Sequence, residues 1–188
     1  MKTIILFSLL MSLSDQKIKW GSCPTVVTAT SFDKTTYVGD WYTTRRSKGV
    51  PWENKDCPLS QYSLRTDGKI AALNSQYSIS DDKITETSGI LEFTNGAKGK
   101  MTRSRWISGN YHVLETDYTG YSIVYSCTRF LFLRFEHAWF LTRSKAPTTA
   151  TLDSYYDTLN GKVDTFSDDG FEDPDHSATD CKYLNDPA

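Results

Sequence analysis

A regular series of short β-like runs, separated by turn-forming residues, is the feature that most constrains the fold of this chain. The runs are rich in aromatic and β-branched residues, which pack well on pleated surfaces. Clusters of Gly, Asn, Asp and Ser separate them, and Asp67-Gly68 is a clear hairpin signal because this pair readily adopts positive φ. The predicted strands cover residues 39–46, 59–65, 70–79, 84–93, 99–107, 111–116, 121–132 and 136–143. Eight such strands in succession favour an up-and-down sandwich or a closed barrel.

A single helix is predicted after the last strand, over about residues 148–160. Thr148 or Thr149 can cap its start, and Gly161 can end it. Its apolar side chains recur at i, i+3, i+4 and i+7 and form one face, made of Leu152, Tyr155, Tyr156 and Leu159. The remaining tail, residues 163–188, is acidic and is predicted to be a solvated loop.

The first residues have the pattern of a secretory signal peptide. Met1-Lys2-Thr3 supplies a positive start, and an apolar run over residues 4–13 follows. That run is too short to cross a bilayer, which requires about 20 apolar residues. Ser12-Leu13-Ser14 fits a cleavage site, so residues 1–14 are predicted to be removed and residues 15–188 to form a single secreted domain.

Four cysteines follow the predicted signal peptide, at positions 23, 57, 127 and 181. An even number of cysteines in a secreted chain implies two disulfides, and the residues alone leave all three pairings open. No Cys-x-x-Cys pair occurs and the three histidines are scattered, so no metal site is predicted. The net charge of −2 gives no electrostatic case for a nucleic-acid partner.

Three short motifs occur in order along the chain. The first is Tyr-Val-Gly-Asp-Trp-Tyr at residues 37–42, the second is Thr-Asp-Tyr at residues 116–118, and the third is Ala-Trp-Phe-Leu-Thr-Arg at residues 138–143. Cys23-Pro24 precedes the first motif, and Glu53-Asn54 precedes Cys57. Together these residues resemble the lipocalin family, and within it the apolipoprotein D and insect bilin-binding lipocalins. The resemblance covers almost the whole chain after the signal peptide.

This resemblance implies a fold, a compartment and a function. The fold is all-β, an eight-stranded up-and-down antiparallel β-barrel spanning about residues 37–143, with one C-terminal α-helix. The implied function is extracellular binding and transport of a small hydrophobic ligand: a fatty acid or other lipid, a sterol, a retinoid or a tetrapyrrole pigment. The implied disulfides are Cys23–Cys127 and Cys57–Cys181.

The motif residues are interpreted as structural rather than functional. In the lipocalin pattern, a tryptophan in the place of Trp41 plugs the closed end of the barrel, and an arginine in the place of Arg143 stacks on it. The aspartate of the second motif caps a neighbouring loop. The residues given this structural role are Gly39, Trp41, Thr116, Asp117, Tyr118 and Arg143.

An eight-stranded barrel is just wide enough to hold one small ligand, and side chains alternate between its two faces. If Arg143 points inward, then Leu141, Trp139 and His137 also face inward. The other candidate ligand-binding faces are Tyr62 with Leu64, Tyr77 with Ile79, and Tyr121 with Ile123 and Tyr125. Trp139 and Tyr62 are the leading candidates, because matching aromatics line the pocket in this branch of the family.

Two further features concern the open end of the barrel. Arg103 and Arg105 alternate on one predicted strand, and an inward guanidinium would demand an anion such as a fatty-acid carboxylate. An outward orientation is favoured, but Arg105 is kept as a candidate basic group for a carboxylate ligand. Trp52 lies in the first loop, which covers the open end in this family. It can close the pocket or make a weak contact with a membrane, a lipoprotein or a receptor.

Two other classes of protein are considered. Some lipocalin-fold proteins are enzymes acting on lipids or pigments, but the isomerase type uses a free thiol and all four cysteines fall on disulfide positions. An immunoglobulin-like domain is suggested by Tyr125-Ser126-Cys127, yet no tryptophan follows the first cysteine at the spacing that this fold needs. The prediction is therefore a carrier without catalytic residues, metal or cofactor.

Overall fold

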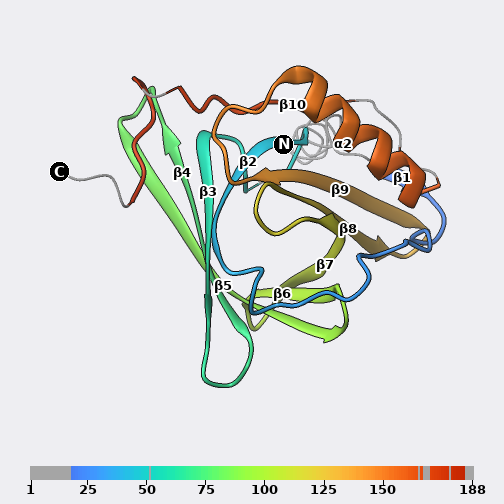
Figure 1. Ribbon diagram of the computed structural model, residues 1–188. Coiled ribbons are helices and arrows are strands. Elements are labelled where there is room, and N and C mark those ends of the chain that lie inside the picture. Colours follow the sequence, from blue (N-terminus) through green and yellow to red (C-terminus); the bar gives the residue numbers. More distant parts are fainter. Residues whose placement is uncertain (1–17, 51, 165, 167–169, 178, 185–188) are drawn as a thin grey trace, which may run out of the picture.

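Eight antiparallel strands close into a barrel in the computed structural model (Figure 1). The barrel strands are β2 (Gly39–Ser47), β3 (Asp56–Leu64), β4 (Ile70–Ser78), β5 (Lys83–Asn95), β6 (Lys98–Ser104), β7 (Ile107–Thr116), β8 (Tyr121–Phe130) and β9 (Leu133–Thr142). Each strand pairs with the next, and β2 pairs with β9 to complete the closure. The predicted fold class is confirmed. The structure describes residues 18–50, 52–164, 166, 170–177 and 179–184, so the predicted signal peptide lies outside the described residues.

Two very short strands extend the sheet beyond the barrel. They are β1 (Ile18–Trp20), which pairs with β9, and β10 (Phe171–Glu172), which pairs with β2. Beneath β1, the fully buried Glu136 carboxylate lies 2.9 Å from the ammonium of Lys19 and accepts a hydrogen bond from the Tyr125 hydroxyl at 2.8 Å. Strands of two or three residues are too short to show a period in the sequence, so neither was predicted.

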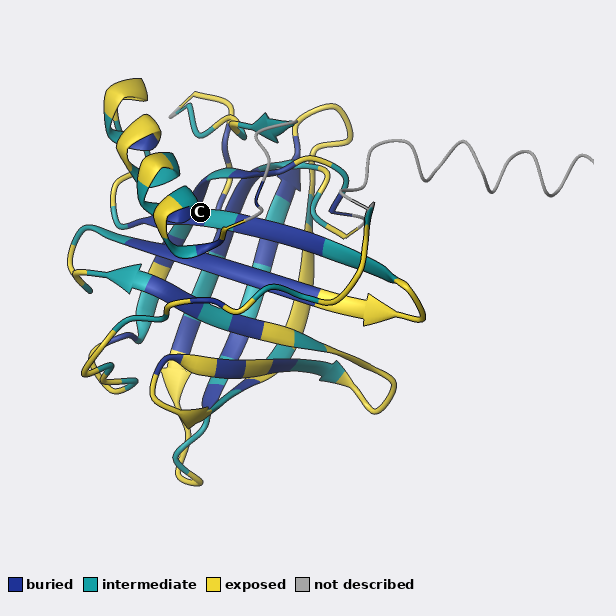
Figure 2. Ribbon diagram, turned by 90° about the vertical axis from the view of Figure 1, so that its right-hand side faces the viewer, coloured by how far each residue is buried: buried dark blue, intermediate teal, exposed yellow. Residues whose placement is uncertain are grey.

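Helix α2 (Thr149–Lys162) lies across the outside of the barrel (Figure 1). The Thr148 hydroxyl caps it by accepting a hydrogen bond from the Thr151 amide at 3.2 Å. Leu152 and Leu159 are buried against the outward side chains of β8 and β9. Figure 2 shows the opposite side of the helix exposed. Within the described residues, no helix is both long enough and apolar enough to cross a membrane.

The closed end of the barrel is built around Trp41 and Arg143. Trp41 is fully buried, its indole N–H donates to the Tyr37 carbonyl at 2.9 Å, and the Arg143 guanidinium lies 3.5 Å from the centre of its ring. The guanidinium also donates to three backbone carbonyls, those of Val38, Asp40 and Tyr118, at 2.6–3.0 Å. Gly39 has φ +101°, and a Cβ there would lie 3.1 Å from Arg143 Nη1, so both the backbone and the stacked arginine require glycine.

The second motif forms the tight connection between β7 and β8. One oxygen of the Asp117 carboxylate accepts hydrogen bonds from the amides of Gly120 and Tyr121, at 2.7 and 2.8 Å. The Thr116 hydroxyl donates to the Tyr121 carbonyl at 2.6 Å and accepts from the Tyr118 amide at 3.0 Å. These side chains satisfy the backbone groups that the turn leaves without a ladder partner.

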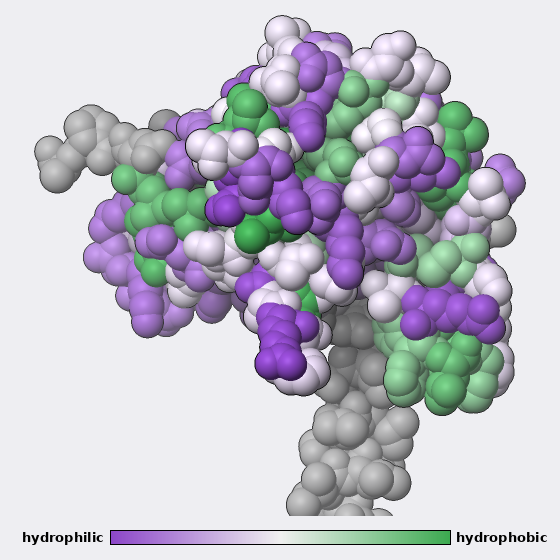
Figure 3. All heavy atoms as spheres, turned by 90° about the horizontal axis from the view of Figure 1, so that it is seen from below, coloured by the Kyte–Doolittle hydropathy of each residue, from purple (hydrophilic) through white to green (hydrophobic). Residues whose placement is uncertain are grey.

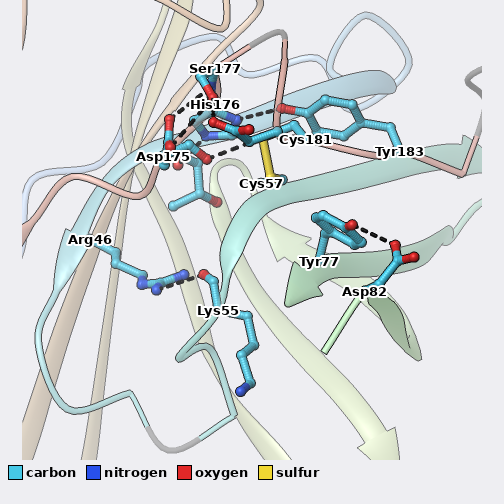
Figure 4. Close-up of a disulfide and its surroundings, with 12 residues drawn as sticks. Arg46, Lys55, Cys57, Tyr77, Asp82, Asp175, His176, Ser177, Cys181 and Tyr183 are labelled. Atoms are coloured by element: carbon cyan, nitrogen blue, oxygen red, sulfur yellow. Dashed lines mark hydrogen bonds between the residues drawn. A yellow bond between two sulfur atoms is a disulfide. The ribbon is translucent and has the colours of Figure 1, made fainter. Parts of the chain in front are cut away.

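Both disulfides are present in the pairing that the family resemblance implies, Cys23–Cys127 and Cys57–Cys181. The second one ties the C-terminal tail to β3 (Figure 4). Beside it, His176 Nε2 donates to the Thr43 carbonyl at 2.9 Å, and Nδ1 accepts from the Tyr183 hydroxyl at 2.8 Å. Burial holds the pKa of His176 below its usual value, which matches a neutral ring with this tautomer.

The prediction of a solvated tail is therefore wrong for much of the described part. Phe166, Cys181 and Tyr183 are buried, and two acidic side chains of the tail pair with arginines on the barrel. Arg46 and Arg45 on β2 bind the carboxylates of Glu172 and Asp173, with shortest distances of 2.6 Å in both pairs. The arginines of β2 thus bind acidic side chains of the tail to the barrel. These pairs join residues more than 120 positions apart, so local sequence patterns do not predict them.

Two hairpins turn at other residues than predicted. Ser108-Gly109-Asn110 was predicted as a turn but lies inside β7, and the chain reverses at Arg105-Trp106. At the β8–β9 hairpin, Phe130 pairs with Leu133 and the turn is Leu131-Phe132, with Leu131 at φ 55°. Neither turn contains glycine, asparagine or proline, so turn chemistry gave no signal there.

Candidate functional site

A cavity of about 380 Å³ lies inside the barrel. Aromatic and aliphatic side chains in its wall alternate with small polar ones, and seven of the eight barrel strands contribute. The lining residues are Thr43, Trp52, Glu53, Ser60, Tyr62, Asn74, Met101, Arg103, Trp106, Ile107, Ser108, Gly109, Asn110, Tyr111, Val124, Ser126, Thr128, Phe135, His137, Trp139 and Leu141. Volume and composition match sites that take small, mostly apolar molecules.

The floor of the cavity is a chain of buried hydroxyl groups. The Tyr62 and Tyr37 hydroxyls each lie 3.0 Å from the Tyr111 hydroxyl, and Tyr37 also lies 2.9 Å from Ser122 Oγ. Burial raises the pKa of all three tyrosines, so they stay neutral. The hydroxyls satisfy one another and form a rigid, closed floor above Trp41.

The loop between β2 and β3 lies over the mouth of the cavity. Gln76 on β4 holds it at two points, because its side-chain amide donates to the Trp52 carbonyl at 2.8 Å and accepts from the Lys55 amide at 3.0 Å. The Glu53 carboxylate reaches down to Trp139 on β9, whose indole N–H donates to it at 2.6 Å. The Trp52 ring lies edge-on to His137, with ring centres 6.4 Å apart.

Arg103 on β6 projects into the same region. Its guanidinium lies 4.6 Å from the centre of the Trp52 ring and 3.5 Å from the Glu53 carboxylate. Burial lowers the pKa of Arg103, and the Glu53 charge opposes that change. Among the described lining residues, Glu53 is the only carboxylate and Arg103 is the only arginine or lysine, so the wall carries one acidic and one strongly basic side chain next to each other.

Two kinds of chemistry find no support among the described residues. No group of three or more His, Cys, Asp or Glu side chains is placed to hold a metal ion in that part of the chain. All four cysteines are described, and each belongs to a disulfide, so the barrel holds no free thiol nucleophile.

Comparison with known proteins assigns the family. Residues 38–178 match the model of the lipocalin / cytosolic fatty-acid binding protein family, a span that takes in the whole barrel and α2. The chain is a lipocalin. This confirms the resemblance that the three sequence motifs carry.

Curated relatives of this lipocalin include vertebrate and insect proteins. It is 30% identical to apolipoprotein D of Rattus norvegicus over 162 residues, which cover 82% of this chain and 85% of that one. It is 29% identical to the Lazarillo protein of Schistocerca americana over 158 residues, covering 80% and 73% of the two chains.

Solved structures give the same assignment. Insecticyanin from the tobacco hornworm Manduca sexta superposes with a TM-score of 0.74 at 25% identity, covering 90% of this chain and 94% of that one. Lobster apocrustacyanin A1 superposes with a TM-score of 0.73 and covers 86% and 92% of the two chains. At 16% identity it supports the fold alone.

Five of the twelve predicted ligand-binding residues of this lipocalin line the cavity. Trp139, His137 and Leu141 share the inner face of β9, as their spacing predicted, and Tyr62 and Trp52 join them from β3 and the first loop. The structure thus brings these five residues together around one space. Their contact with a ligand stays a prediction.

The prediction for β8 chose the wrong face. Ile123 and Tyr125 do not line the cavity; they are buried on the outside of the barrel, where they pack with α2, and Tyr121 points the same way. The inner residues of β8 are Val124, Ser126 and Thr128. Both faces of β8 are buried because the helix covers its outer face, so the more apolar face was mistaken for the inner one.

Four more predicted residues lie elsewhere. Leu64 is 49% exposed at the end of β3, and Tyr77 packs outside the barrel in the cluster of Cys57 and Cys181. Arg105 is exposed in the β6–β7 turn, with its guanidinium 5.0 Å from the centre of the Trp106 ring. Ile79 is also exposed. Neither Tyr77 nor Ile79 belongs to the lining; the β4 residue that lines the cavity is Asn74, and Tyr77 lies on the opposite face of the strand.

Sequence reasoning missed the polar members of the wall. Arg103, rather than Arg105, faces the cavity, although the outward orientation was favoured for both. Glu53 was noted only as part of a family motif. Gly109 was assigned to a turn. Ser60 could have been predicted, because it lies two residues before Tyr62 on the same strand and therefore shares its face.

Proposed function

We propose that this protein binds and carries a small hydrophobic molecule in the cavity of its barrel. The observation that carries the proposal is a cavity of about 380 Å³, closed below by packed tyrosines and covered above by one loop, in a lipocalin barrel. Affinity would come mostly from burial of apolar ligand surface, at about 25 cal/mol per Å². The ligand classes that fit are lipids and pigments: fatty acids, sterols, retinoids and tetrapyrroles.

The same reasoning supports an extracellular carrier rather than an enzyme. The two disulfides suit an oxidising compartment, and residues 1–14 have the pattern of a signal peptide. The thiol that a lipocalin-fold isomerase would use is engaged in a disulfide at each cysteine position. We therefore propose secretion followed by non-covalent ligand transport.

A cavity-filling variant tests the carrier function. Gly109 lines the cavity, and a Cβ there would meet only Ser126 Oγ at 3.8 Å, so a larger side chain can grow into the space. We expect Gly109→Phe to weaken binding of a fluorescent fatty-acid ester at least about 100-fold, because the ring occupies the ligand's volume. Fluorescence titration measures this. Circular dichroism reports the fold.

Gly161→Phe is the matched control, because a Cβ at that position on α2 meets nothing within 4 Å. It should leave the affinity unchanged. Equal affinity of Gly109→Phe and the natural protein would show that the ligand binds outside the barrel, and would overturn the proposed site.

A second candidate function is contact with a lipid surface, and exposed apolar side chains at two hairpin tips support it. Trp106 is 83% exposed and Leu131 is 68% exposed, at the tips of the β6–β7 and β8–β9 hairpins. Beside them, the exposed Trp20 stacks on Phe132 with ring centres 4.7 Å apart. In the space-filling view, apolar side chains form a compact group at the lower right (Figure 3). Exposed apolar patches of this kind mark surfaces that bind partners or lipid.

These hairpin tips suit a lipid surface better than Trp52, whose ring is held by Arg103 and His137. We expect the natural protein to float with phosphatidylcholine vesicles containing phosphatidylserine, and Trp106→Ser/Leu131→Ser to lower that partitioning about tenfold. Leu64→Ser, at the opposite end of the barrel, should change nothing. Equal partitioning of the three proteins would contradict the surface assignment.

A further inference from the structure

The charged pair in the cavity wall goes beyond a general site for apolar molecules. Arg103 is 16% exposed, and its one polar partner among the described residues is Glu53, 3.5 Å from Nη2. Its Nε is buried with no hydrogen-bond partner. A guanidinium has five N–H donors, and buried charged groups are normally well paired. Arg103 therefore keeps unused donor capacity in the wall of the cavity.

A second donor points at the same carboxylate. Trp139 donates its indole N–H to Glu53 at 2.6 Å, so Arg103 on β6 and Trp139 on β9 converge on Glu53. Both donors stand on barrel strands, whereas the carboxylate comes from the loop between β2 and β3. The barrel thus builds a binding place for a carboxylate, and a side chain of the covering loop occupies it.

We propose that Arg103 and Trp139 form the anchor for the carboxylate of an amphipathic organic acid, and that Glu53 fills this anchor while no ligand is bound. This inference rests on the proposed carrier function and specifies its ligand class. The apolar body of the acid lies along Tyr62, Met101 and Leu141. One carboxylate replaces another beside Arg103, so the buried guanidinium stays paired.

Release of Glu53 does not require the loop to unfold. Gln76 holds the loop backbone through the Trp52 carbonyl and the Lys55 amide, and neither bond involves the Glu53 side chain. Rotation of that side chain frees the anchor while the loop stays over the cavity. The Trp52 ring keeps its place on Arg103, where it shields the new ion pair from water.

The test compares an acid with its neutral ester. We would titrate the protein with cis-parinaric acid and with its methyl ester, and take the ratio of the two dissociation constants. The acid should bind at least about tenfold more tightly than the ester in the natural protein. Arg103→Gln should lower the preference for the acid over the ester about 10- to 100-fold, because hydrogen bonds to charged groups contribute that much.

Glu53→Gln is an independent test that keeps both donors. The neutral amide competes less well for Arg103, so the preference for the acid over the ester should rise about tenfold. Arg105→Gln is the matched control: it is two residues away and exposed, so the ratio should not change. Ester binding by each variant confirms that the cavity is intact.

The titrations test the carboxylate anchor and the carrier function separately. Equal binding of acid and ester by the natural protein, or an unchanged ratio in Arg103→Gln, would overturn the anchor while leaving the carrier function standing. Failure of the natural protein to bind either compound would count against the carrier function itself.

Discussion

Trp41→Ala is expected to lower the free energy of unfolding by about 3–5 kcal/mol, the range for removing a large buried aromatic side chain. Trp41 is fully buried, so the variant leaves a cavity at the closed end of the barrel. The Tyr37 carbonyl, which accepts the indole N–H at 2.9 Å, loses its partner. The Arg143 guanidinium loses the ring that it covers at 3.5 Å.

Denaturation by guanidinium chloride, followed by circular dichroism, measures this loss. Trp106→Ala is the matched control, because that side chain is 83% exposed and its removal should change stability by less than about 0.5 kcal/mol. A loss below about 1 kcal/mol in Trp41→Ala would show that the closed end does not depend on the indole. Arg143 would then hold it through its three backbone hydrogen bonds alone.

Removal of the Cys57–Cys181 disulfide, as Cys57→Ser/Cys181→Ser, is expected to lower the free energy of unfolding by about 2–4 kcal/mol. The bond joins residues 124 positions apart, and in the chain-entropy account a long closed loop restricts the unfolded state most. Neither cysteine lines the cavity, so ligand affinity should not change. The C-terminal tail should exchange its amide protons faster in the variant.

Hydrogen exchange over residues 171–184, together with chemical denaturation, distinguishes the local from the global effect. The Cys23→Ser/Cys127→Ser variant is the control: it removes a bond of similar span, 104 residues, that does not hold the tail. It should lose comparable global stability while the tail stays protected. Unchanged exchange in the Cys57→Ser/Cys181→Ser tail would show that His176 and the Arg45 and Arg46 ion pairs suffice to hold it.

The sequence by itself determined the architecture, because that information is local. Alternating runs and turn residues predict eight strands, and the 3.6-residue period of residues 148–160 predicts the helix. The motif around Gly39 and Trp41, with Arg143 at the end of the last strand, was enough to indicate the family. The resemblance then selected one of three disulfide pairings, which spacing alone cannot do.

The tertiary structure decided which face of each strand looks inward. Alternation divides a strand into two faces but does not say which one meets the cavity. On β9 the choice was correct for Trp139 and His137. On β8 it was wrong, because α2 buries the outer face and makes Tyr125 as inaccessible as a lining residue.

The exact position of a turn also decides which side chains line the cavity. The reversal at Arg105-Trp106, rather than at residues 108–110, brings Gly109 into the wall and leaves Arg105 in solvent. Arg103 faces the cavity and meets Glu53 from a loop 50 residues earlier in the chain. Local patterns thus determine strands and helix, whereas the charged pair exists only after the barrel closes, since closure alone places β6, β9 and the first loop around one space.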